Sequence, residues 1–284
     1  MNELIAEIAS RLSSVEEIAA VALGGSYARG TQRPDSDIDL GLYYRENAPF
    51  SIQDIKEVAG ELSDEPRPVV TDFGRWGSWV NGGAWLTVKG RRVDFLYRSL
   101  DKLERVIDEC RRGEFESDYY QQAPYGFHSY IYLGELSICK PLHDPDEALA
   151  RLKERIVPYP LPLKKSIVQR FLWSVEFDLA QAEKFAAQGD VYNATGCFTR
   201  CAAALVQAVY ALNERYFLTD KGALAEIRSF AVKPEGFGAI LEAALSRPGA
   251  TNDELSESAS KLGNLFREVV EACGDLYSRP DFRA

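Results

Sequence analysis

Two aspartates that follow a glycine-rich turn are the residues of this sequence best suited to chemistry. The run Gly24-Gly25-Ser26 is followed, after ten further residues, by Asp37-Ile38-Asp39. A strand beginning at Ile38 would point both carboxylates to one face. Neighbouring carboxylates raise each other's proton affinity unless a cation lies between them. Magnesium binds carboxylate and phosphate oxygens, and the backbone amides of the turn are open to an anion. The run therefore indicates phosphoryl or nucleotidyl transfer.

A third carboxylate is expected from a later strand. Gly90 belongs to a turn, and the alternation of Val93, Phe95 and Tyr97 after it is typical of a strand entered from a hairpin. Asp94 lies between these apolar residues and would point to the opposite face. A charged residue there is easiest to explain if that face carries the site, and the alternative is a solvated strand residue.

The elements that must position these residues follow from hydrophobic periodicity and turn signals. Ser26 is expected to cap a short helix that begins at Tyr27, and Gly30 to end it. Residues 113–128 are expected to be irregular. The expected helices are 2–15, 52–62, 100–112 and 130–138, and the expected strands are 18–23, 38–43, 69–72, 84–88 and one carrying Asp94.

The second half of the chain has a helical period almost throughout. The proline-rich run 157–162 indicates a linker, because its three prolines cannot propagate a helix. About five helices are expected after it, including 191–212, 224–230, 237–245 and 253–273. The predicted fold class is α+β, with a small mixed-sheet domain over residues 1–156 and an all-α helical bundle over residues 157–284.

Composition excludes several classes of protein. The 284 residues carry a net charge of −10, which argues against general nucleic-acid binding, since such proteins usually carry a basic surface. No apolar run approaches the roughly 20 residues that cross a membrane, so we expect a cytoplasmic protein. Cys197 and Cys201 are four apart in a helical run, but no nearby histidine completes a zinc site, and they are interpreted as buried apolar residues.

The glycine–serine turn, the Asp-x-Asp pair ten residues later and the strand with Asp94 together resemble the nucleotidyltransferase superfamily related to DNA polymerase β. With its helical second half, the chain looks like the kanamycin- and lincosamide-type antibiotic nucleotidyltransferases and their bacterial relatives. The resemblance covers residues 18–43 and 84–98, and the helical half matches only in general character.

This resemblance implies a role for each matching residue. Asp37 and Asp39 would hold two magnesium ions, and Asp94 would bridge them or act as general base. Gly25 would allow close approach of the backbone and Ser26 would contact the phosphates of ATP or another nucleoside triphosphate. The residues that would help to hold the nucleotide are Arg29, Ser36 and, from the bundle, Lys221.

The function implied is transfer of a nucleoside monophosphate, AMP from ATP being the first choice, to a hydroxyl of a small-molecule acceptor such as an aminoglycoside-like antibiotic. Two alternatives stay open: AMP transfer to a protein, as in toxin-neutralising relatives, and a non-catalytic nucleotide-binding module. A homodimer fits this group. Further candidates are helical carboxylates as an acceptor-side base and aromatic residues as the lining of an acceptor pocket. They are Glu135, Glu176, Asp178, Trp76, Trp79, Trp85, Tyr119, Tyr120 and Tyr125.

Overall fold

The computed structural model describes residues 1–279, which form two compact units. Unit 1 comprises Met1–Glu109 and Phe115–Pro158, and unit 2 comprises Cys110–Glu114 and the chain from Tyr159 onward. Unit 1 combines a mixed sheet with helices and unit 2 is helical, so the fold class is α+β, as the sequence predicts.

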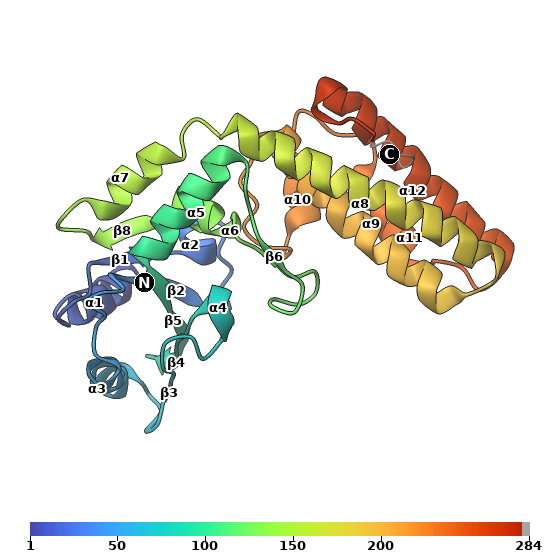
Figure 1. Ribbon diagram of the computed structural model, residues 1–284. Coiled ribbons are helices and arrows are strands. Elements are labelled where there is room, and N and C mark those ends of the chain that lie inside the picture. Colours follow the sequence, from blue (N-terminus) through green and yellow to red (C-terminus); the bar gives the residue numbers. More distant parts are fainter. Residues whose placement is uncertain (280–284) are drawn as a thin grey trace. The chain divides into compact units, whose positions relative to one another are not determined.

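A six-stranded sheet in the order β3-β4-β5-β2-β1-β8 forms the frame of unit 1 (Figure 1). Strands β2 and β5 are parallel, and each of the other neighbouring pairs is antiparallel. A separate two-stranded ribbon pairs β6 with β7. The strands are β1 (Ala20–Leu23), β2 (Ile38–Tyr44), β3 (Val69–Val70), β4 (Gly83–Val88), β5 (Arg91–Ser99), β6 (Ser117–Asp118), β7 (Phe127–His128) and β8 (Lys140–His143).

One face of this sheet is the main core of unit 1. The alternating apolar residues of β2 and β5, such as Leu40 and Phe95, are fully buried in one cluster with apolar residues of α1 and α3. Burying these faces removes apolar area from water, which stabilises the fold by about 25 cal/mol per Å². The helices of unit 1 are α1 (Asn2–Leu12), α2 (Gly25–Arg29), α3 (Ile52–Leu62), α4 (Gly77–Val80), α5 (Leu100–Arg112), α6 (Ile131–Ile138) and α7 (Ala148–Arg155).

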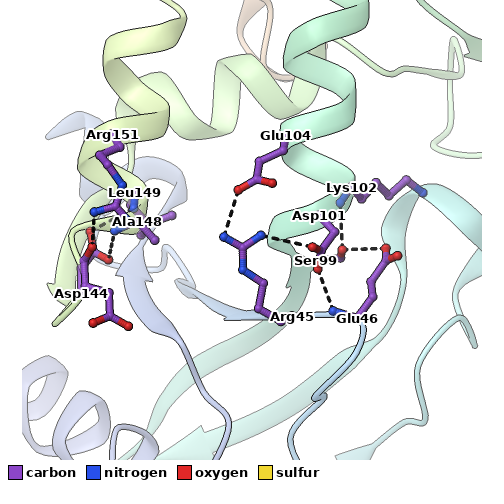
Figure 2. Close-up of polar contacts among 11 residues, drawn as sticks. Arg45, Glu46, Ser99, Asp101, Lys102, Glu104, Asp144, Ala148, Leu149 and Arg151 are labelled. Carbon is purple, nitrogen blue, oxygen red and sulfur yellow. Dashed lines mark hydrogen bonds and ion pairs between the residues drawn. The ribbon is translucent and has the colours of Figure 1, made fainter.

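A polar network fixes the end of β2 to the start of α5 (Figure 2). Arg45 forms ion pairs with Asp101 at 3.2 Å and with Glu104 at 2.9 Å. The backbone N–H of Glu46 donates to Asp101 at 2.7 Å, and the Ser99 hydroxyl donates to the Glu46 carboxylate at 2.7 Å. This network holds the carboxyl end of β2, so the aspartates at its other end start from a fixed strand.

Unit 2 is built around the long helices α8 (Leu161–Ala187) and α9 (Val191–Leu212), which pack side by side and against α12 (Asn252–Cys273) (Figure 1). Helices α10 (Ala223–Ile227) and α11 (Phe237–Ser246) complete it. Asp190 caps α9 by accepting from the N–H of Asn193, and Thr251 with Glu254 forms a capping box at α12. These caps satisfy N–H groups that have no partner inside the helix.

Helix α9 corrects the expectation that no apolar run has the length of a membrane span. Its 22 residues are long and apolar enough to meet that criterion. However, 67% of its most apolar window is buried within the fold, and Phe198, Leu205 and Val209 are fully buried. This burial is what a core helix of a folded unit shows.

Three local predictions are wrong, and one strand was not expected. Helix α2 begins at Gly25 with Gly24 as its N-cap, so Ser26 lies inside the helix and does not cap it, although Gly30 ends it as predicted. Pro162 lies in the first turn of α8, where a missing N–H costs nothing, so the helix begins inside the predicted linker. Strand β8 was not expected, and β6 and β7 lie in the segment 113–128 that was predicted to be irregular.

Candidate active site

Two aspartates and one tryptophan, on three neighbouring strands, form one row across the sheet. Asp39 of β2 is the registered neighbour of Asp94 in β5, and Asp94 is in turn the registered neighbour of Trp85 in β4. Registered neighbours point to the same face of a sheet. All three are at least partly exposed, whereas Leu40 and Phe95 beside them are fully buried. The row therefore lies on the face opposite the α1–α3 core.

The glycine turn after β1 lies directly against Asp39. The N–H of Gly24 donates to the backbone oxygen of Asp39 at 2.8 Å. Gly25 has a φ of +54°, and a Cβ added there would lie 1.8 Å from Asp39 Oδ2. Only glycine allows this approach, because a side chain would occupy the position of the carboxylate. The turn and the carboxylate thus form one local structure.

Asp37 is held beside the start of β5. Arg91 and Arg92 donate to the backbone oxygens of Pro34 and Asp35 respectively, which ties the preceding loop to β5. Arg92 Nε lies 2.6 Å from Asp37 Oδ1 in an ion pair, although that oxygen is buried and accepts no well-directed hydrogen bond. Since Arg92 is two-thirds exposed, the pair adds little stability. The Asp37 carboxylate therefore keeps unused capacity to accept or to bind a cation.

The Asp94 carboxyl has an altered proton affinity. Burial, and next the negative charge of Asp37, raise its pKa to about 6, while Arg92 lowers it in part. The charge of Asp37 therefore acts on Asp94 across the pairing of β2 with β5. Perturbed carboxyl groups of this kind are typical of functional sites.

The donor set fits magnesium in its chemistry. It consists of carboxylate oxygens, which hard divalent cations prefer. Asp37 Oδ1 is buried and incompletely paired, and the ionised form of Asp94 is destabilised by burial and by the like charge of Asp37. Within residues 1–279, however, no group of three or more His, Cys, Asp or Glu side chains has the arrangement of a metal site. A site built from Asp37, Asp39 and Asp94 would require Asp37 to turn from Arg92, and this ligand set stays a prediction.

The residues predicted to hold the nucleotide occupy separate elements. Ser26 is the second residue of α2 and is half-buried, and Arg29 is the exposed last residue of this helix. Ser36 precedes Asp37, and its hydroxyl accepts from the N–H of Arg33 at 2.8 Å. Lys221 belongs to unit 2 and is exposed in the segment between α9 and α10. Their contacts with a nucleotide stay predictions.

The candidate helical bases have structural partners. Glu135 forms a two-pronged ion pair with buried Arg98, at 2.7 and 2.8 Å. Asp178 is buried and pairs with Arg200 at 3.0 Å, and Glu176 accepts from the Tyr277 hydroxyl at 2.6 Å. Each of the three carboxylates thus has a structural partner, and a role as acceptor-side base stays a prediction.

Sequence reasoning overlooked Arg92 as a neighbour of the aspartates. Arg92 is two residues before Asp94, so strand alternation alone places the two side chains on one face. Asp37 and Arg92 directly precede the registered pair Ile38 and Val93, so the parallel pairing of β2 with β5 brings them together. The first signal was present in the sequence, and the second depends on a pairing that no local pattern reveals.

The segments of the chain that match known protein families do not coincide with its two compact units. Residues 3–113 match the model of a nucleotidyltransferase domain, and residues 133–221 match a domain of unknown function (DUF4037). No curated protein matches the chain. Among solved structures, it is similar to a nucleotidyltransferase-like protein from Exiguobacterium sibiricum 255-15, with 11% identity, a TM-score of 0.49, and coverage of 97% of this chain and 78% of that one.

Proposed function

We propose that the protein is a magnesium-dependent enzyme that transfers AMP from ATP to a hydroxyl of a small-molecule acceptor, because residues 3–113 match the model of a nucleotidyltransferase domain. The domain supports transfer of a nucleoside monophosphate in general. The observation that supports a working centre in this chain is the row of Asp39 and Asp94, with the charge of Asp37 acting on Asp94 and Gly25 lying against Asp39.

In the proposed reaction, the acceptor oxygen forms a bond to the α-phosphorus as the bond from phosphorus to the α,β-bridging oxygen breaks, and pyrophosphate leaves. The acceptor's proton passes to a carboxylate, and Asp94 is the proposed base, since in the metal-free fold burial and the charge of Asp37 raise its pKa to about 6. Bound magnesium ions would neutralise charge on the transferred and leaving phosphates.

The remaining residues bind and orient the triphosphate. The Gly24–Gly25 turn brings backbone amides close to Asp39, and Ser26 follows it on α2. We propose that Ser26, Arg29 and Ser36 contact the phosphates. Positioning and electrostatic stabilisation would supply most of the rate.

The five cysteines are free, which agrees with action in the reducing cytoplasm, and we propose this compartment. With a net charge of −10, the proposed partners are the nucleotide and the acceptor and not nucleic acid. A homodimer is the oligomer to test by light scattering of the purified protein.

The test is a transfer assay with α-labelled ATP and magnesium, using aminoglycosides, lincosamides and cell extract as acceptors. We expect a labelled small molecule from the wild type and a loss of at least 100-fold in the Asp37→Asn/Asp39→Asn double variant, which keeps size but removes both charges. A matched control is Asp118→Asn in β6, which should retain activity. Undiminished transfer in the double variant would exclude this mechanism, and label found only on protein would favour the protein-modifying alternative.

A further inference from the structure

Two tryptophans form an exposed stack beside the carboxylates of unit 1. The rings of Trp76 and Trp85 lie 4.1 Å apart between centroids at an interplanar angle of 26°. Trp85 is 48% exposed, although a side chain of this size usually buries most of its surface. Trp85 therefore offers a large aromatic surface that a ligand could contact.

The structure holds this stack in position by two devices. Gly83 leaves room for Trp76, because a Cβ at this residue would lie 2.9 Å from the Trp76 ring. The Gln121 side chain donates to the backbone oxygen of Trp76 at 2.9 Å and accepts from the N–H groups of Trp79 and Val80 at 3.0 and 3.4 Å. The loop that carries Trp76 is thus fastened, and the aromatic surface is preorganised.

The position of Trp85 ties the stack to the proposed centre. Trp85 is the registered neighbour of Asp94 on the face that also carries Asp39. Such neighbours lie about 5 Å apart at their Cβ atoms. Across the sheet, the order from β1 to β4 is therefore the glycine turn, Asp39, Asp94 and the tryptophan stack.

This order separates the two sides of the proposed reaction. In phosphoryl-type transfer, the attacking and the leaving oxygens are in line on opposite sides of the phosphorus. If the leaving pyrophosphate lies at the glycine turn on the β1 side, the acceptor must approach from the β4 side. The Trp76–Trp85 stack occupies that side.

We propose that the Trp76–Trp85 stack binds the acceptor by one face of a ring that carries the reacting hydroxyl. This inference rests on the proposed function. The ring is that of a sugar or an aromatic compound, since both present flat C–H or π surfaces to an indole, and a cationic ring gains further attraction. Stacking orients the hydroxyl toward Asp94, so the pair determines acceptor specificity and takes no part in bond making.

The test compares Trp85→Ala, Trp76→Ala and the conservative Trp85→Phe with wild type. The control is Trp173→Ala, which removes a tryptophan of unit 2 that is 40% exposed and stacks on Phe177. The probes are kanamycin, lincomycin and the low-molecular-mass fraction of a bacterial extract. We expect Trp85→Ala to raise the KM for the acceptor about tenfold, as loss of an aromatic contact of 1 to 1.5 kcal/mol predicts, with the KM for ATP unchanged. Trp85→Phe should recover most of the loss.

A second measurement needs no turnover. Without ATP or magnesium, the same probes should quench indole fluorescence in wild type and Trp173→Ala but not in Trp85→Ala. Quenching that depends on Trp85 would support the inference even if no transfer occurs and the proposed function fails. Transfer with an unchanged acceptor KM in Trp85→Ala would overturn the inference alone, as would a raised KM for ATP, which would assign the stack to the nucleobase. Absence of both transfer and quenching would overturn both proposals.

Discussion

At the scale of single residues, the site is governed by the charge on Asp94. Its ionised form is destabilised by burial and by the charge of Asp37, so in the absence of a cation the folded state binds this proton more tightly than the unfolded chain does. The sequence alone singled out all three aspartates as candidates, because their spacing and turn context are local, and the structure makes Asp39 and Asp94 registered neighbours. The sequence could not indicate the raised pKa of Asp94, because the desolvation of this carboxyl and the partial compensation by Arg92 depend on strand pairing.

The pH dependence of stability follows from this shift. Asp94 has a pKa of about 6 in the fold and 3.8 as its ordinary value, so the folded state binds more protons between these values. The unfolding free energy of metal-free protein should therefore fall as pH rises through this window. Two pKa units correspond to about 3 kcal/mol, which partial exposure reduces to about 1–2 kcal/mol.

Asp94→Asn lacks this ionisation and should gain about that amount relative to wild type between pH 4 and pH 7. Urea unfolding in EDTA at the two pH values measures the difference. Asp101→Asn is the control of opposite sign, since hydrogen bonding to the Glu46 N–H keeps the pKa of Asp101 below its usual value. This variant should lose stability, most of all at neutral pH. An Asp94→Asn effect independent of pH would contradict the account.

A second prediction concerns the glycine turn. Gly25→Ala and Gly30→Ala both place alanine at positive φ, +54° and +73°, at a cost of about 1–2 kcal/mol each. Only at Gly25 would the new Cβ meet Asp39, whereas the space around Gly30 is open within 4 Å. Transfer activity should fall at least 100-fold in Gly25→Ala and less than about threefold in Gly30→Ala. Equal losses would show that backbone strain alone matters.

At the scale of elements, periodicity predicted the strongly amphipathic and well-capped segments. Helix α3, with Ser51 as its cap, and helices α5 and α9 have the bounds that the sequence indicates. Strand β8 was missed because it is a short edge strand with Pro141 and mostly exposed residues, which carry no apolar alternation. The Trp85–Asp94 pairing also escaped prediction, since register between strands is not written in either strand alone.

The pairing of Arg98 with Glu135 gives a prediction at this scale. The ion pair joins β5 to α6, and the Arg98 side chain is only 7% exposed. Glu135→Ala would leave a buried cation without its partner and should lower the unfolding free energy by about 3 kcal/mol. The double variant Arg98→Met/Glu135→Leu should lose distinctly less. Chemical denaturation measures both, and a mild effect of Glu135→Ala with loss of activity would restore Glu135 as a candidate base.

At the scale of the whole molecule, the two units are not consecutive in the chain. The segment Cys110–Glu114, at the end of α5, belongs to unit 2, and a Cβ on Gly113 would lie 2.8 Å from the backbone oxygen of Pro162. Composition and the proline-rich run predict two domains, residues 1–156 and 157–284, that meet at a single point of the sequence. An interleaved segment of five residues leaves no such trace in composition.

This interleaving predicts the behaviour of a fragment ending at residue 156. Cys110 is fully buried in the intact protein and should lose its cover, so its thiol should react at least tenfold faster with a thiol reagent in the fragment. Cys139 is the internal control, since it is buried within unit 1 and should stay slow in both. Labelling followed by mass spectrometry resolves the two sites. Equal protection of Cys110 in both proteins would contradict the assignment of its segment.

The parallel pairing of β2 with β5 also limits how the gene can change over generations. One codon inserted in β5 before Asp94 would turn its carboxylate from the face of Asp39 into the apolar core, because side chains alternate along a strand. No such penalty applies to residues 66–68, which lie outside any strand in the connection from α3 to β3 and follow Asp64, whose carboxylate accepts from the N–H groups of Lys89 and Gly90. Descendants of a common ancestor should therefore vary in length at this connection and keep an unbroken count of residues from Arg91 to Asp94.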